Sequence, residues 1–142
     1  MKAGPLNVLL VDDDKVDAMA LKRSFRDLKI AHPVFETGNG IEALECLRGE
    51  NGRARIPSPY VVLLDLNMPQ MGGFEFLREL RRDRELRSAL VFVMTTSAAA
   101  DDRKRAYDLN VAGYVLKHRP GESFLESINK LAAYWRVIEY PN

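Results

Sequence analysis

Apolar and polar residues alternate in blocks along this chain, and each block has the period of one kind of secondary structure. Short, nearly continuous apolar runs are typical of strands that are buried on both faces of a sheet. Five such runs predict strands at residues 7–11, 33–37, 60–64, 90–95 and 112–116. The longer stretches repeat apolar residues at helical spacing, which predicts helices. These helices are expected at residues 16–28, 41–48, 74–82, 101–109 and 122–138.

The alternation of five strands with five helices predicts an α/β fold. Each strand–helix–strand unit forms a right-handed crossover, so consecutive strands run parallel and helices cover both faces of the sheet. The expected architecture is a doubly wound, five-stranded parallel sheet. Residues 49–59 contain two glycines and two prolines, and we expect them to form an irregular loop.

Composition narrows the class of protein. The chain has 142 residues, which fits one domain, and 46% of them are apolar, which is ample for a core. Lys and Arg number 21 against 20 Asp and Glu, and the resulting net charge of +1 argues against direct nucleic-acid binding. The apolar runs are far shorter than the roughly 20 residues that cross a bilayer, so no membrane insertion is expected. A lone Cys46 excludes an internal disulfide and fits a cytoplasmic location.

Polar side chains follow the strands at their carboxyl ends, where ligands gather in an open parallel sheet. An acidic triplet at residues 12–14 follows the first strand, and Asp65 follows the third. Thr95 ends the fourth strand, and Lys117 follows the fifth. Clustered carboxylates repel one another unless a cation lies among them, and hard oxygen ligands at an open edge suit Mg²⁺. A carboxylate in such a place can attack phosphorus, while a lysine and a hydroxyl can stabilise the phosphoryl group.

Four motifs in this order resemble the receiver domain of two-component response regulators. They are VLLVDDD at residues 8–14, LDLNMP at 64–69 with Gly73, MTTS at 94–97, and AGYVLK at 112–117. The resemblance implies a flavodoxin-like fold with strand order 2-1-3-4-5. It implies a single receiver domain over residues 1–142, with a core at 6–134 and a C-terminal aromatic extension at 135–142.

The resemblance also implies a phosphoacceptor and a metal site. Asp65 is the implied acceptor of a phosphoryl group from a phosphohistidine on a sensor histidine kinase. Asp13, Asp65 and the backbone carbonyl of Asn67 are the implied ligands of Mg²⁺, whereas Asp12 acts through water. The chain is expected to be a signalling protein and not an enzyme, although it catalyses its own phosphotransfer and autodephosphorylation.

Further residues carry the implied response to phosphorylation. Thr95 is expected to hydrogen-bond the phosphoryl oxygens, and Lys117 is expected to pair with them. Tyr114 is the implied aromatic switch, which moves inward as Thr95 is drawn toward the phosphoryl group. The side chains of Asn67 and Ser97 occupy positions that tune hydrolysis of the acyl phosphate in this family.

A finer resemblance points to a class of kinase. The loop at 49–59, the triplet at 95–97 and the terminal segment 134–141 resemble small stand-alone response regulators that partner bacterial phytochrome-type histidine kinases. The apolar residues Trp135, Ile138 and Tyr140 run past the usual end of a receiver. They predict a homodimer contact through the C-terminal helix and tail.

The chain departs from the family pattern at two positions. His118 follows Lys117 where the family has proline after a cis peptide bond, which leaves the geometry of this peptide open. Gly72 stands where an aspartate often precedes the glycine, here Gly73, and is expected to affect the turn more than the chemistry. His32 and His118 have no partners at metal-ligand spacing and are interpreted as surface residues.

Two other classes of protein fit part of the pattern. The sequence Asp12-x-Asp14-x-Val16 resembles the nucleophile motif of haloacid-dehalogenase phosphatases, with Asp12 as nucleophile and Asp14 as general acid. That family needs a later acidic pair, which nothing after Lys117 supplies, and Asp65 would be left without a role.

The other alternative is a non-phosphorylated pseudo-receiver that serves only as an interaction module. The complete set of acidic, hydroxyl and lysine side chains argues against it.

Overall fold

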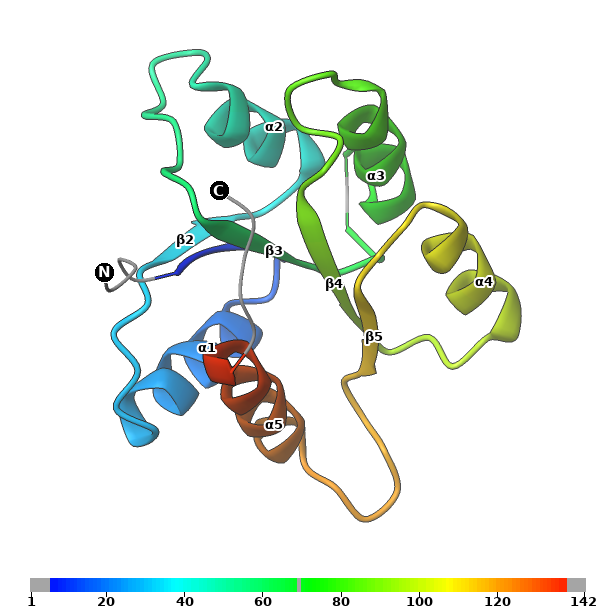
Figure 1. The fold of residues 1–142 in the computed structure, drawn as a ribbon. Helices are drawn as coiled ribbons and strands as arrows, with labels where there is room; N and C mark the ends of the chain where they lie inside the picture. The colour runs from blue at the N-terminus through cyan, green and yellow to red at the C-terminus, as the bar shows by residue number, and fades with distance from the viewer. Residues whose placement is uncertain (1–5, 69, 138–142) are drawn as a thin grey trace.

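The computed structural model describes residues 6–68 and 70–137, in which five strands and five helices alternate (Figure 1). The strands are β1 (Asn7–Val11), β2 (Val34–Thr37), β3 (Tyr60–Leu64), β4 (Leu90–Thr95) and β5 (Gly113–Leu116). The helices are α1 (Lys15–Asp27), α2 (Gly40–Arg48), α3 (Gly73–Arg82), α4 (Ala100–Asp108) and α5 (Phe124–Val137). Every predicted element is present, and each end lies within two residues of its predicted position.

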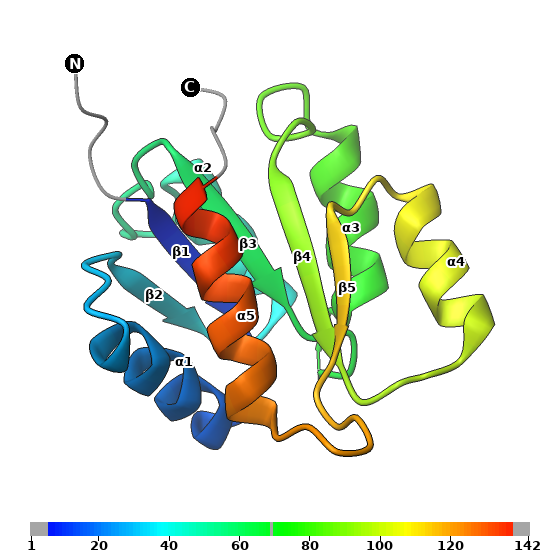
Figure 2. The same cartoon turned by 60° about the horizontal axis from the view of Figure 1, so that its bottom comes forward.

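The strands form one parallel sheet in the order β2-β1-β3-β4-β5. The predicted strand order is therefore confirmed. The chain winds one way from β1 to β2 and the other way from β3 onward, so the winding direction changes between β1 and β3. Helices α1 and α5 pack against each other on one face of the sheet, and α2, α3 and α4 cover the other (Figure 2).

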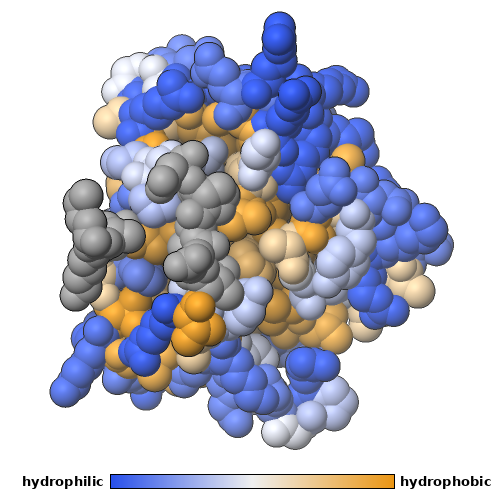
Figure 3. Space-filling view, viewed as in Figure 1, coloured by the Kyte–Doolittle hydropathy of each residue, from blue (hydrophilic) through white to orange (hydrophobic). Residues whose placement is uncertain are grey.

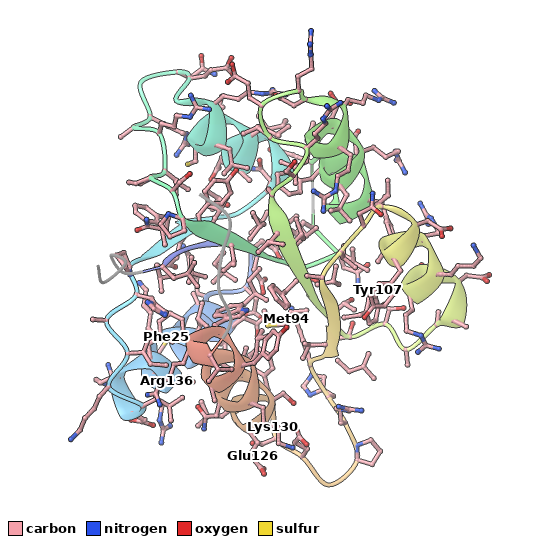
Figure 4. All side chains as sticks on the ribbon, in the orientation of Figure 1. Phe25, Met94, Tyr107, Glu126, Lys130 and Arg136 are labelled. Atoms are coloured by element: carbon pink, nitrogen blue, oxygen red, sulfur yellow. The ribbon has the colours of Figure 1, made fainter. Side chains whose placement is uncertain are left out.

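Each face of the sheet has its own core because side chains alternate along a strand. Leu9, Val62 and Val93 belong to the core beneath α2, α3 and α4. Their neighbours in sequence belong to the core beneath α1 and α5, which also contains Phe25 and Met94 (Figure 4). Burial on both faces explains why the strands read as continuous apolar runs. Figure 3 shows apolar residues between the helices in this view and hydrophilic residues around them.

The strand ends are aligned at one edge of the sheet. The backbone N–H of Asp12 donates to the carbonyl of Thr37 at 3.0 Å, and that of Asp65 donates to Val11 at 2.9 Å. The N–H of Lys117 donates to the carbonyl of Thr95 at 2.8 Å. These bonds extend the sheet one residue beyond its strands, so the side chains that follow start from a rigid base.

Gly73 allows α3 to begin directly against the loop that follows β3. Its N–H donates to the carbonyl of Leu66 at 3.2 Å. A Cβ at this position would lie 2.6 Å from Cα of Leu66 and 2.8 Å from the carbonyl oxygen of Asp65. Any side chain here would push the helix away from Asp65. Gly72 is the N-cap of α3 and offers no side-chain hydrogen bond to the helix. An aspartate at this position could cap the helix, so the glycine leaves the N-terminus of α3 without a side-chain cap.

Trp135 belongs to the core, so it is not available for the homodimer contact that the sequence analysis assigns to it. It is 1% exposed, and its ring lies edge-on to Phe25 and Phe92 at centroid distances of 6.3 and 5.5 Å. Helix α5 continues through it to Val137, and Trp135 belongs to the apolar stripe that packs on the sheet. An exposed stripe would have the same spacing, so the spacing does not distinguish the two. The other predicted tail residues, Ile138 and Tyr140, lie outside the described residues.

His32 is half-buried, which corrects its interpretation as a surface residue. Its Nδ1 accepts a hydrogen bond from the N–H of Leu6 at 3.2 Å, and its ring lies edge-on to Phe25 at 5.7 Å. Burial, and then the nearby charge of Arg136, lower the pKa of His32, which keeps the imidazole neutral. Arg136 lies at the contact of α5 with α1, where it donates to the carbonyl of Leu28 (Figure 4).

The peptide bond after Lys117 is one whose geometry the sequence leaves open. In the described ranges the cis peptide bond is that between Ser58 and Pro59, so the Lys117–His118 bond is trans. His118 is exposed, as predicted.

Within residues 6–68 and 70–137, none of the helices combines the length and the apolar character that a bilayer span requires.

The buried position of Trp135 predicts an unequal effect of truncating two neighbours on α5. We expect Trp135→Ala to lower the free energy of unfolding by about 3–5 kcal/mol, because it empties a large volume in the core. Val137→Ala is the control, since Val137 is 78% exposed and its truncation should change stability by less than about 0.5 kcal/mol. Urea denaturation measures both, and similar small losses in the two variants would contradict the core assignment.

Candidate functional site

Three carboxylates converge at the carboxyl edge of the sheet. Oxygen atoms of Asp12, Asp13 and Asp65 all lie within 4.8 Å of one another. Asp12 and Asp65 are buried, whereas Asp13 is exposed. The prediction that β1 and β3 deliver their acidic residues to one place is therefore confirmed.

The two buried carboxylates are each held by a backbone N–H two residues further along the chain. Oδ1 of Asp12 accepts from Asp14 at 2.9 Å, and Oδ1 of Asp65 accepts from Asn67 at 3.2 Å. In both residues the other oxygen, Oδ2, lies 3.3 Å from Nζ of Lys117. Each carboxylate is thus fixed at one oxygen and faces the same ammonium with the other.

Lys117 is the buried cation of the site, and it has a partner that the sequence analysis does not identify. Its side chain is 9% exposed, and its closest carboxylate is that of Asp17, with Nζ to Oδ2 at 2.6 Å. Asp17 lies in the first turn of α1 and is buried as well. A signal for it was present, because Asp17 shares one helix face with the buried residues Leu21 and Ser24.

Burial and crowding shift the pKa values of these groups. Burial, the side-chain hydrogen bond with Asp17 and its charge raise the pKa of Asp12 to about 8, against the opposing effects of the Asp14 N–H and of Lys117. Burial also raises the pKa of Asp65, although the Asn67 N–H and Lys117 oppose it. Burial alone would lower the pKa of Lys117, but the hydrogen bond to Asp17 and the charges of the three carboxylates raise it above its usual value. The site is therefore short of positive charge.

A divalent cation fits this donor set. Asp12, Asp13 and Asp65 offer hard oxygen ligands, and Mg²⁺ is typically held by a few carboxylates while it keeps several waters. The exposed Asp13 leaves the cluster open to solvent. A cation would offset the burial and the neighbouring carboxylate charge that together raise the pKa of Asp12. The role of the Asn67 carbonyl as a ligand stays a prediction.

Thr95 and Tyr114 are linked to each other through Ser97. Thr95 is fully buried, and its Oγ1 accepts from the N–H of Ser97 at 3.2 Å. The hydroxyl of Tyr114 donates to the carbonyl of Ser97 at 2.9 Å. Oγ of Ser97 donates to Asp102, in the first turn of α4, at 2.6 Å. This chain of hydrogen bonds connects the end of β4 with β5 and α4.

Asp14 has a structural task in this arrangement. Its Oδ1 accepts the N–H of Val16 at 2.9 Å and so caps the N-terminus of α1. Asp14 is exposed and is not among the carboxylates that converge, within the part of the chain that the structure describes.

The sequence matches the response regulator receiver domain family over residues 8–129. A probable methanogenesis regulatory protein, FilR2 of Methanothrix harundinacea, is 35% identical over 131 residues, which cover 92% of this chain and 84% of that protein. The response regulator Rcp1 of Synechocystis is 30% identical over 131 residues, which cover 92% of this chain and 89% of Rcp1.

Solved structures resemble this chain over nearly its whole length. The phosphorylated cyanobacterial phytochrome response regulator RcpA superposes with a TM-score of 0.88 at 29% identity, covering 98% of this chain and 100% of that one. The Mn²⁺-bound form of Rcp1 superposes with a TM-score of 0.86 at 28% identity, covering 97% and 100% of the two chains.

Proposed function

Because the chain belongs to the response regulator receiver family, we propose that Asp65 accepts a phosphoryl group from a sensor histidine kinase and thereby switches a partner-binding surface. One observation carries this proposal. The Asp65 carboxylate belongs to the cluster that fits a divalent cation, and its Oδ2 lies 3.3 Å from the Lys117 ammonium. Lys117 and a cation held by the cluster would together supply the positive charge that an arriving phosphoryl group needs.

The chemistry is one nucleophilic substitution at phosphorus. A carboxylate oxygen of Asp65 attacks, the P–N bond of phosphohistidine breaks, and its electron pair leaves with the imidazole. Lys117 neutralises the phosphoryl oxygens, and the buried Thr95 supplies a hydroxyl donor at the neighbouring strand end. Mg²⁺, held by Asp13, Asp65 and the carbonyl of Asn67, with Asp12 acting through water, would supply further charge neutralisation. Hydrolysis of the acyl phosphate, in the same site, returns the protein to its first state.

The contacts of Asp14 favour this assignment over the phosphatase alternative. Asp14, the general acid of that alternative, uses its carboxylate to cap α1 and is not among the carboxylates that converge in the described part of the chain. Asp12 and Asp65 are held alike, each by a backbone N–H and by Lys117. The alternative therefore lacks its general acid and leaves Asp65 without a role.

A kinase-facing surface lies beside the site. Helix α1 begins directly after the acidic triplet and exposes Val16 and Met19, each at 68%. They line a groove of about 410 Å³, whose other lining residues are Ala20, Lys22, Arg23, Arg26 and Leu125. We assign this groove to the segment that presents the phosphohistidine.

The similarity to Rcp1 and RcpA favours a phytochrome-type kinase as the phosphoryl donor. The proposed location is the cytoplasm, where Cys46 stays reduced.

The switch surface is proposed to lie around β5, α4 and α5. Helix α4 is lightly anchored, since Ala106 is its buried residue and Tyr107 is 49% exposed (Figure 4). Tyr114 and Tyr134 line a groove of about 250 Å³ between β5 and α5. A displacement of Thr95 would act on Tyr114 through Ser97, and Tyr114 borders this groove. The proposed homodimer uses this side of α5, with Tyr134 and Val137 in place of the buried Trp135.

Phosphorylation of Asp65 is directly testable. Wild-type protein incubated with Mg²⁺ and acetyl phosphate should gain the mass of one phosphoryl group, and EDTA should abolish the gain. Asp65→Asn should gain none because it lacks the nucleophile, whereas Asp27→Asn, an exposed carboxylate on α1, should behave as wild type. Intact-protein mass spectrometry measures each sample. A mass gain that persists in Asp65→Asn but disappears in Asp12→Asn would favour the phosphatase alternative.

The dimer proposal is tested by sedimentation velocity. Phosphorylated protein should contain a larger dimer fraction than the unmodified protein, because the modification acts on the surface around Tyr114 and α5. Val137→Asp should remain monomeric in both states, since it places a charge in the proposed contact. An unchanged dimer fraction on phosphorylation, or a dimer that survives in Val137→Asp, would refute the proposal.

A further inference from the structure

The closest partner of Lys117 is neither the nucleophile nor one of the acidic residues that follow β1. Its Nζ lies 2.6 Å from Asp17 Oδ2 but 3.3 Å from Oδ2 of Asp12 and of Asp65. Asp17 comes from α1, an element that supplies no other contact to this ammonium among the described residues. Its side chain is 9% exposed, so the pair is shielded from solvent.

Asp17 reaches Asp65 through Lys117, and it also lies beside Asp12 and raises the pKa of that carboxyl. The carboxylates that converge within 4.8 Å in the described part of the chain are Asp12, Asp13 and Asp65, and Asp17 is not one of them. It is therefore placed to hold the lysine without joining the cation cluster. At saturating Mg²⁺, its effect on phosphoryl transfer can therefore be measured apart from any effect on metal binding through Asp12.

The geometry of the ammonium gives Asp17 a specific task. A lysine has three N–H donors on a flexible four-carbon stem. Hydrogen bonds to Asp17 and Asp12 fix two directions of Nζ, and the remaining side of the ammonium faces Asp65. Without Asp17, the ammonium would lose its closest partner and would keep the two longer contacts of 3.3 Å, to Asp12 and Asp65.

We infer that Asp17 is a positioning residue for phosphoryl transfer, which holds the Lys117 ammonium beside Asp65 before the phosphoryl group arrives. This inference rests on the proposed function. With acetyl phosphate as donor, the P–O bond of the donor breaks, a P–O bond to Asp65 forms, and the electron pair leaves with acetate. Lys117 stays protonated throughout and meets the phosphoryl oxygens without rearranging, which is the advantage of a preorganised charge.

The test compares two substitutions of Asp17 at saturating Mg²⁺ with acetyl phosphate as donor. Asp17→Ala removes the anchor, and we expect the phosphorylation rate to fall about tenfold or more, since small misplacements of a catalytic group carry large rate penalties. Asp17→Asn keeps an oxygen that accepts from Lys117, and its rate should lie between those of Asp17→Ala and wild type. Mg²⁺ affinity, measured by calorimetry, should stay within about twofold of wild type in both variants.

Ser24→Ala provides a matched control on the same helix. Ser24 is fully buried and bonds to Asn129, so its loss weakens the packing of α1 without touching Lys117. Its phosphorylation rate should equal that of wild type. The inference is overturned if Asp17→Ala is phosphorylated at or above the wild-type rate, if Asp17→Asn is no better than Asp17→Ala, or if Mg²⁺ affinity falls in parallel with the rate. A wild-type chain that takes up no phosphoryl group would instead refute the proposed function.

Discussion

The constraint on which this structure depends is the placement of one buried ammonium among three buried carboxylates. Lys117 contacts Asp12, Asp17 and Asp65, and each of these charges would be strongly destabilising if it were buried alone. Lys117 follows β5, and its three partners come from the ends of β1 and β3 and from the first turn of α1. The site therefore exists only when the sheet is formed and α1 is packed on it, which ties the chemistry to the complete fold.

The order of the strands determines how the ammonium reaches its partners. Strands β3 and β4 lie between β5 and β1, so the long stem of Lys117 must pass toward the middle of the sheet to meet Asp12. The change of winding direction between β1 and β3 opens the edge at which Asp12 and Asp65 meet. Carboxylates outnumber the one ammonium of the site, and burial, followed by the neighbouring Asp17, raises the pKa of Asp12 to about 8 even with Lys117 in place. A cation-binding function is thus a consequence of the charge balance.

The hydrophobic pattern was sufficient to predict every element and the edge where Asp12, Asp65 and Lys117 converge, because strand ends in a parallel sheet share one side. The strand order came from the family resemblance. The pattern could not place Trp135, since core and surface stripes on a helix have equal spacing. Asp17 was missed because an acidic residue in a first helical turn is usually explained by the helix dipole, and only the packing of α1 shows that it is buried.

Mg²⁺ calorimetry at pH 7 in two buffers of different ionisation enthalpy tests whether a divalent cation completes the strand-end site, where carboxylates outnumber the Lys117 ammonium. Because burial raises the pKa of Asp12 to about 8, a fraction of the molecules carries a proton on this carboxyl near pH 7, and the bound cation should displace it. We expect one Mg²⁺ per chain, proton release, tighter binding at pH 8 than at pH 6, and loss of binding in Asp13→Asn. Binding without proton release that persists in Asp13→Asn, or no saturable binding, would show that these carboxylates do not form a divalent-cation site.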